Sequence, residues 1–115
     1  METKNALTAL AALAQETRLA VFRLLVETGP EGLPVGKIGE RLSIAPATLS
    51  FHLKELAHAD LVTMRHEGRF IYCSASFATM NNLLAYLTEN CCGGTAAYVP
   101  FCEPVACEPP RKESA

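Results

Sequence analysis

The sequence has no tryptophan, and aromatic residues make up only 7% of its 115 positions. It also has no excess of charge, because 10 basic and 12 acidic residues leave a formal net charge of −2. A chain this close to neutral gives no overall sign of binding to nucleic acid or to an anionic membrane, so any such function must come from local motifs. No apolar run approaches the roughly 20 residues of a membrane-spanning helix. Half of the residues are hydrophobic, which predicts a single globular domain with a modest core.

The apolar segment ALTALAALAQ near the start lacks the features of a secretory signal. Only Lys4 precedes it, beside Glu2, and Thr8 interrupts it. Its leucines recur at every third position, as on one face of a helix, so we expect a helix here and a cytoplasmic protein. Cytoplasmic thiols stay reduced, and an odd number of cysteines with one adjacent pair suits a disulfide framework poorly. The clustered cysteines are therefore expected to be ligands or sensors.

Two helices are predicted at the start of the chain. Residues 4–14 have an Ala/Leu face. Residues 15–28 predict a second helix with these apolar residues aligned on one side: Leu19, Phe22, Leu25 and Val26. The pair Gly29-Pro30 ends the second helix, because the residue before a proline is disfavoured in the helical conformation.

A helix-turn-helix is predicted next. A connector containing Gly and Pro leads to a short helix at about residues 36–42, and a tight link separates it from a helix that begins near Pro46. Proline suits the first turn of a helix, where its missing N–H costs nothing. Phe51 and His52 are expected to lie off the apolar face of the second helix, which is formed by three leucines: Leu49, Leu53 and Leu56.

A β-hairpin, a last helix and a tail complete the predicted architecture. Residues 61–73 are rich in strand-forming side chains, and Glu67-Gly68 marks a turn between two short runs. Residues 76–90 predict a helix whose apolar stripe suits either the core or a dimer interface: Phe77, Met80, Leu83, Leu84 and Leu87. After this helix the periodicity ends. We therefore divide the chain into a domain over residues 1–90 and a tail rich in cysteine and proline over residues 91–115.

The order and spacing of these elements resemble the winged helix-turn-helix repressors of the ArsR/SmtB family. The residues that carry the resemblance are ETRLAVFRLLVE in the second helix, IAPATLSFHLKELAHADLV across the turn and the following helix, and VTMRHEGRFIYC in the hairpin. The resemblance covers about residues 7–90. It implies a mainly α, α+β fold: a winged helix-turn-helix with terminal dimerisation helices. It also implies a homodimer that binds an inverted repeat in double-stranded operator DNA.

The predicted recognition helix carries the side chains expected to contact bases. Such a helix needs small or polar side chains in its first turns to reach base edges in the major groove. The expected contacts are Ala47, Thr48, Ser50, Phe51 and His52. Phe51 can touch a thymine methyl group or pack against the hairpin instead, and His52 can equally be a solvated helix residue.

The hairpin supplies two further candidate contacts with DNA. Arg65 and Arg69 flank its turn, where a guanidinium can enter the minor groove or bind a phosphate. Alternatively, both can be surface charges that only keep the protein soluble. Residues 37–72 contain only one more Lys or Arg than Asp or Glu. Affinity for DNA must therefore depend on where the charges point and on two copies binding together, and salt should weaken it.

The tail concentrates the thiols, since four of the five cysteines lie within residues 91–107. Thiolates are soft ligands that select thiophilic ions. Cys91 and Cys92 directly follow the last predicted helix, and adjacent cysteines rarely close a disulfide, although each can offer its sulfur to one ion. Cys102 and Cys107 can fold back onto this pair. Trivalent arsenic or antimony takes three sulfurs in a pyramid, whereas zinc or cadmium prefers four in a tetrahedron.

Within the family, this tail resembles that of arsenic-responsive members with a vicinal cysteine pair after the last helix and one distal cysteine. The resemblance implies As(III) as the inducer, bound by Cys91, Cys92 and a third thiolate. Cys102 is the nearer candidate for that third ligand, and Cys107 is the alternative. Antimonite is a further candidate inducer, and so is methylarsenite, which needs only two sulfurs.

Two other ligand sites of the family are absent from the sequence. Pro34 and Gly36 stand where other arsenic or cadmium sensors carry cysteines at the start of the third helix. Residues 76–90 contain neither the Asp nor the His that zinc sensors carry on the last helix. The tail is therefore the expected ligand site. Cys73, alone at the end of a strand, is expected to be a small buried hydrophobe.

These observations predict a cytoplasmic homodimeric repressor that is released from its operator by As(III). One alternative keeps the fold and senses thiol oxidation or persulfide, but residues 15–28 lack the cysteine that such members use. Another is an interaction module whose tail holds a structural zinc. No enzyme is expected, because no histidine or carboxylate pair is placed beside the tail thiols.

Overall fold

The computed structural model describes residues 1–94, in which the elements follow the predicted order. Their bounds are α1 Thr3–Leu13, α2 Glu16–Thr28, β1 Leu33–Pro34, α3 Val35–Leu42, α4 Pro46–His58, β2 Val62–Glu67, β3 Phe70–Ala75, α5 Phe77–Leu87 and α6 Cys91–Gly94. The helices accompany one small antiparallel sheet with the strand order β1-β3-β2. The predicted winged helix-turn-helix fold is confirmed.

The helices begin and end where local chemistry dictates. Gln15 caps α2, because its side chain accepts a hydrogen bond of 2.9 Å from the backbone N–H of Arg18. Ser76 caps α5 in the same way through the N–H of Thr79. Between α3 and α4, Ser43 adopts the left-handed conformation with φ 56°, which turns the chain sharply before Pro46. The predicted positions of these helices are therefore confirmed to within a few residues.

The sheet contains one strand that sequence analysis did not predict. Strands β2 and β3 pair from Val62↔Ala75 to Glu67↔Phe70, which leaves a two-residue turn in which Gly68 has φ 62°. The short strand β1 pairs with the opposite edge of β3, with Leu33 against Cys73. It lies in the segment taken as a plain connector, because two residues are too few to show a strand pattern.

The core confirms most of the predicted apolar positions but corrects two helix faces. Its largest fully buried side chains come from four helices or strands and one loop: Val21, Leu25, Ile38, Leu49, Leu53, Leu56, Leu61 and Cys73. In α1 the buried residues are the alanines, whereas Leu7 is 61% exposed and Leu10 also faces outward. In α2, Leu19 is 43% exposed, while Val21 is buried. The small alanines let α1 approach its neighbours closely, so Leu7 and Leu10 are left on the outside, whereas Leu13 packs partly against the core.

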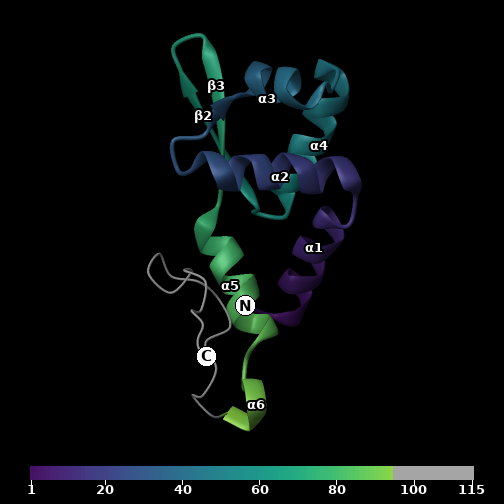
Figure 1. Ribbon diagram of the computed structural model, residues 1–115, viewed down its shortest axis with the longest axis vertical. Coiled ribbons are helices and arrows are strands. Elements are labelled where there is room, and N and C mark those ends of the chain that lie inside the picture. Colours follow the sequence, from purple (N-terminus) through teal and green to yellow (C-terminus); the bar gives the residue numbers. More distant parts are fainter. Residues whose placement is uncertain (95–115) are drawn as a thin grey trace, which may run out of the picture.

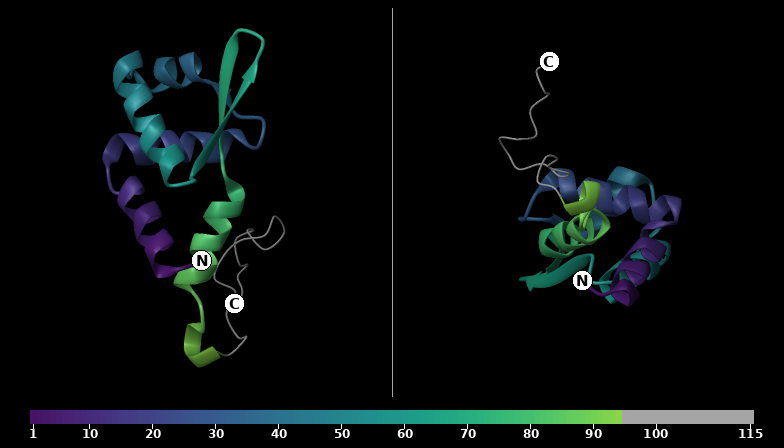
Figure 2. Two further views of the ribbon diagram at one scale, coloured as in Figure 1. Left: turned by 180° about the vertical axis from the view of Figure 1, so that it is seen from behind. Right: turned by 90° about the horizontal axis from the view of Figure 1, so that it is seen from below.

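The molecule is elongated, with two ends of different character. Figures 1 and 2 show α3, α4 and the hairpin tip at one end, α2 across the middle, and α1 and α5 extending toward the other end. A hydrogen bond between the hydroxyls of Thr3 and Tyr86 joins α1 to α5. Helix α5 ends earlier than predicted, at Leu87, and Asn90 turns the chain with φ 56° before α6. Among residues 1–94, no helix combines the length and apolar character needed to cross a membrane.

Candidate nucleic-acid interface and thiol site

Helix α4 presents an exposed polar face along its first turns. Ala47, Thr48, Ser50 and Phe51 are all exposed, and the ring of Phe51 is 55% exposed. The opposite face is anchored by the buried leucines named above, so α4 is held rigidly while its first turns stay accessible. Four of the five predicted contacts in this helix are therefore placed where a ligand can reach them.

His52 is the exception, and its expected place off the buried face is wrong. Its side chain is only 9% exposed. Nη1 of Arg18, in α2, lies 3.4 Å from its Nδ1, and the ring of Phe51 packs edge-on with centroids 5.5 Å apart. His52 follows Leu49 by three residues, so it falls at the edge of the buried face, where Arg18 covers it. We therefore leave His52 out of the exposed surface of α4.

The two arginines of the hairpin differ in how firmly they are held. Arg65 donates from Nε to Oε2 of Glu67 at 2.8 Å, and its guanidinium lies 4.8 Å from the centre of the Tyr72 ring. Arg69 occupies the second position of the turn and is exposed. Within the described part of the chain, Arg69 forms no ion pair. Its charge is therefore available to a ligand, whereas that of Arg65 is partly neutralised.

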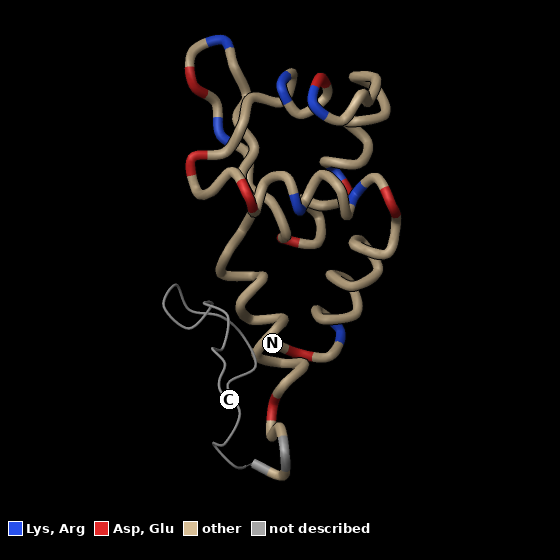
Figure 3. Tube along the Cα trace, viewed as in Figure 1, with Lys and Arg blue, Asp and Glu red and all other residues tan. Residues whose placement is uncertain are grey.

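Charge is distributed unevenly along the molecule. Figure 3 shows Lys and Arg on the hairpin and on the α3 and α4 end, whereas the far half of the molecule is mostly uncharged. Helix α5 contains no charged residue at all. At the charged end, Lys37 and Glu40 are both exposed and lie 3.6 Å apart. Such a pair contributes little to stability in solvent, so Lys37 can exchange this partner for a phosphate.

The thiols with described positions fall into two environments. Cys73 is fully buried in β3, as predicted, and burial raises the pKa of its thiol to about 12. Cys91 begins α6 and is partly buried, with Cys92 following it in the same turn. Cys102 and Cys107 lie outside the described residues. Among the described side chains of residues 1–94, which do not include that of Cys92, no three His, Cys, Asp or Glu side chains converge as metal ligands.

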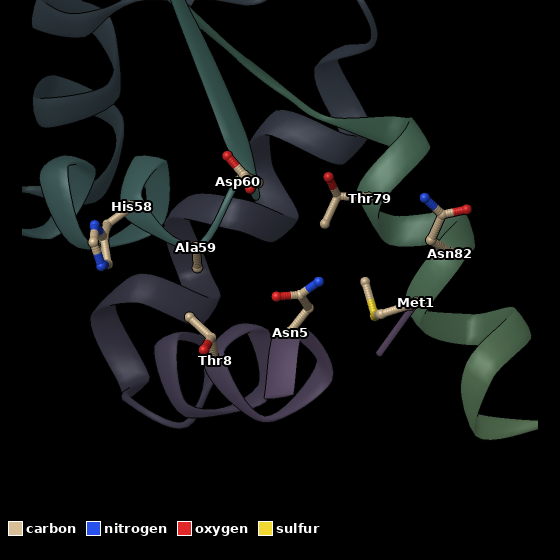
Figure 4. Close-up of a pocket in the computed structure, with 8 residues that line it drawn as sticks. All are labelled: Met1, Asn5, Thr8, His58, Ala59, Asp60, Thr79 and Asn82. Carbon is tan, nitrogen blue, oxygen red and sulfur yellow. The ribbon is translucent and has the colours of Figure 1, made fainter. Parts of the chain in front are cut away.

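A polar hollow of about 370 Å³ lies between α1, α5 and the end of α4 (Figure 4). It is lined by Met1, Asn5, Thr8, His58, Ala59, Asp60, Thr79 and Asn82. Asp60 is its only carboxylate, and in Figure 4 the imidazole of His58 points away from the centre. The lining contains no thiol and no serine, so this hollow lacks a nucleophile paired with a base.

Sequence analysis assigned no role to Arg18. Its partners come from different elements, because Nε donates to the backbone oxygen of Ala12 at 2.7 Å, whereas Nη1 contacts His52. No local pattern marks such a residue. An arginine near the start of an amphipathic helix is normally interpreted as a solvent-exposed charged residue.

Comparison with known proteins connects this architecture to transcriptional regulators. A family model described as a helix-turn-helix domain matches residues 13–65. The HTH-type transcriptional regulator YceK of Bacillus subtilis is 38% identical over 78 residues, which is 68% of this chain and 77% of YceK.

Two solved structures extend the likeness to three dimensions. An ArsR-like transcriptional regulator from Rhodococcus sp. RHA1 is 26% identical, with a TM-score of 0.64 over 76% of this chain and 78% of that one. A structure described as a "possible transcriptional regulator for arsenical resistance" is 29% identical, with a TM-score of 0.61 over 69% of this chain and 79% of that one.

Proposed function

The chain belongs to the ArsR/SmtB family of helix-turn-helix transcriptional regulators, and we propose that it is a cytoplasmic, homodimeric repressor released from DNA by trivalent arsenic. Membership of the family makes it a DNA-binding regulator and not an enzyme. The observation that carries the arsenic proposal is the placing of Cys91 and Cys92 directly behind α5, followed by two more cysteines in the tail.

The DNA contacts in this proposal come from the charged end of the molecule. The exposed residues Ala47, Thr48, Ser50 and Phe51 of α4 would meet base edges in the major groove. Arg69 at the hairpin tip, with Arg65 behind it, would bind a phosphate or enter the minor groove. Two copies would read the halves of an inverted repeat, because each contributes only one recognition helix.

The dimer in this proposal forms through the uncharged half of the molecule. Leu7 of α1 and Leu87 of α5 are each more than half exposed, and Leu10 is exposed beside them. Helix α5 has no charged residue, although Asn81 and Asn82 are exposed on it. The Thr3–Tyr86 hydrogen bond holds α1 and α5 together as one surface. Exposed leucines on two joined helices favour an interface between two copies of the chain.

The arsenic site in this proposal joins Cys91, Cys92 and either Cys102 or Cys107. Arsenous acid would exchange three As–O bonds for three As–S bonds, and the three thiol protons would leave with its hydroxyls as water. Soft thiolates suit this ion, and the described residues at the start of α3 and along α5 offer no competing thiol. The relative described as a possible regulator for arsenical resistance supports the same signal.

The switch in this proposal works through α5, which carries the apolar surface along its length and the vicinal thiols just beyond its end. Ordering the tail around arsenic would shift α5 and, with it, the two recognition helices relative to their half-sites. To empty the operator, arsenic must bind the released form more tightly by several kcal/mol, since a ligand with equal affinity for both forms shifts nothing.

Counting reactive thiols tests the proposal without knowledge of the operator. We would reduce the protein, remove metals, titrate with arsenite and measure the thiols that remain reactive. The thiol of Cys73 should not react at any point of the titration, because it is buried and its raised pKa of about 12 keeps it protonated. We expect three thiols lost per chain at one equivalent, and no such loss in the variant Cys91→Ser/Cys92→Ser.

Matched variants separate the outcomes. Cys73→Val should leave the loss of three thiols unchanged, and replacing Cys102 and Cys107 one at a time identifies the third ligand. Loss of two thiols would instead indicate methylarsenite or a redox signal. Four thiols held by tightly bound zinc in the purified protein would indicate a structural metal. If arsenite protects no thiol, the sensing half of the proposal is wrong.

A further inference from the structure

A single guanidinium joins three helices of the DNA-binding domain. Arg18 belongs to α2, but its Nε donates to the oxygen of Ala12 in the last turns of α1, at 2.7 Å. Its Nη1 lies 3.4 Å from Nδ1 of His52 in α4. The planar fork of arginine fixes the angle between these two donors. Arg18 therefore ties the position of α4 to that of α1.

This contact requires a neutral imidazole. A guanidinium has only donors, so Nδ1 of His52 must accept and the ring proton must sit on Nε2. At 3.4 Å the hydrogen bond is long, and its direct energy is small. The larger effect comes from charge: a protonated His52 would turn an N–H and a positive charge toward Arg18 in a site with little access to water.

The groups around this pair do not cancel the charge of Arg18. Glu55 and His58 of α4 line the adjoining hollow beside Arg18, and α1 contributes only uncharged residues to it. In residues 1–94, Glu55 forms no ion pair with Arg18 or His58. No side chain of α3 or β2 forms a hydrogen bond with His52 in that range. Within that range, Arg18 is therefore the hydrogen-bond partner of the His52 side chain.

We propose that His52 is a positioning residue, whose neutral imidazole accepts from Arg18 and thereby sets the recognition helix α4 against α1 and α2. Loss of this contact would loosen α4 and lower the affinity for DNA. This inference rests on the DNA-binding part of the proposed function and is independent of arsenic. It also assigns His52 an indirect role in place of the base contact that sequence analysis expected.

Four single variants test the pair. His52→Asn keeps an acceptor near the place of Nδ1 but cannot be protonated. His52→Leu removes the acceptor. Arg18→Lys keeps the charge but removes the planar guanidinium, whose Nε and Nη1 contact Ala12 and His52. His58→Asn is the matched control, because it removes an exposed histidine from the same helix. The probe is a duplex selected by the wild-type protein from a randomised pool, with its dissociation constant measured at pH 8 and constant salt.

We expect His52→Asn to bind within about twofold of wild type at pH 8, and His52→Leu and Arg18→Lys to bind about fivefold more weakly. The double variant Arg18→Lys/His52→Leu should lose no more than either single variant, because both remove the same contact. His58→Asn should bind like wild type, because His58 is exposed and is not the hydrogen-bond partner of Arg18. Thermal melting confirms that each variant is folded.

Two results would overturn the inference. If the His52 variants lost affinity at one base pair only, while Arg18→Lys bound normally, His52 would be a base-reading residue. If nitrogen NMR of the folded wild type showed the proton on Nδ1, Arg18 could not be its donor. The NMR result does not need DNA, so it separates failure of this inference from failure of the proposed function, which would appear as no duplex selected.

Discussion

At the scale of single residues, the fold depends sharply on Gly32. Its φ is +77°, and a Cβ at this position would lie 2.5 Å from the backbone oxygen of Cys73. This close approach lets the following residues, Leu33 and Pro34, pair with the edge of β3 as β1. A side chain there would force the two segments apart and would also strain the backbone.

Gly32→Ala should therefore lower the free energy of unfolding by about 3 kcal/mol, through the strained φ and the contact with Cys73 together. The control is Gly36→Ala in α3, where an added Cβ meets nothing within 4 Å. That change should raise stability by about 0.5 to 1 kcal/mol, because alanine favours helix over glycine. Urea unfolding measures both. Equal midpoints for the two variants would contradict the close approach.

At the scale of the elements, α1 and α5 have inner faces that contribute to the core and outer faces on which exposed leucines lie among polar residues. In α1 the inner face is made of alanines, and in α5 Leu83 is the one fully buried residue. Both helices place leucines outside: Leu7 and Leu10 in α1, Leu87 in α5. A domain this small gains little from leucines left in water, which favours a second copy as their cover.

The double variant Leu7→Glu/Leu87→Glu should therefore weaken self-association at least about tenfold, because it buries four charges per dimer in an apolar interface. Sedimentation equilibrium measures the change, and circular dichroism checks the fold. The control is Phe70→Glu, which adds the same charge at a residue 59% exposed on the hairpin. A wild-type protein that is monomeric at micromolar concentration would contradict the assignment.

At the scale of the whole molecule, charge is distributed unevenly, because residues of both signs lie mostly on the hairpin, α2, α3 and α4 (Figure 3). Basic side chains gather at the hairpin and the α3–α4 end, while α5 carries none (Figure 3). The arrangement matters more than the total, because phosphate contacts form only with cations that face the duplex. Arg69 at the hairpin tip is the exposed cation best placed for such a contact.

Arg69→Gln should make the salt dependence shallower. The magnitude of the slope of log affinity against log salt should fall by about one per protomer, since the change removes one phosphate contact. Lys4→Gln is the control, because it removes the same charge from the opposite half of the molecule. Fluorescence anisotropy from 50 to 300 mM salt, on the selected duplex, measures both. Equal slopes for the two variants would exclude Arg69 from the phosphate contacts.

The sequence by itself determined the elements other than β1 and α6, because their signals are local. Pro46 in a first turn, Gly29-Pro30 at a helix end and Gly68 in a hairpin turn each act through the conformation of one or two residues. The same holds for Cys73, whose place on a strand rich in apolar residues predicted its burial. The thiol cluster is also a property of the sequence alone, and its arsenic ligation stays a prediction.

Only the tertiary structure decided which faces of these elements meet. Periodicity identified an apolar side of α1, but close packing selected Ala6, Ala9 and Ala12 for the core and left Leu7 and Leu10 outside. It could not show that Arg18 covers His52, nor that β1 pairs with β3, since the partners lie 34 and 40 residues apart. Contacts between distant residues depend on how whole elements pack, and no local rule contains that information.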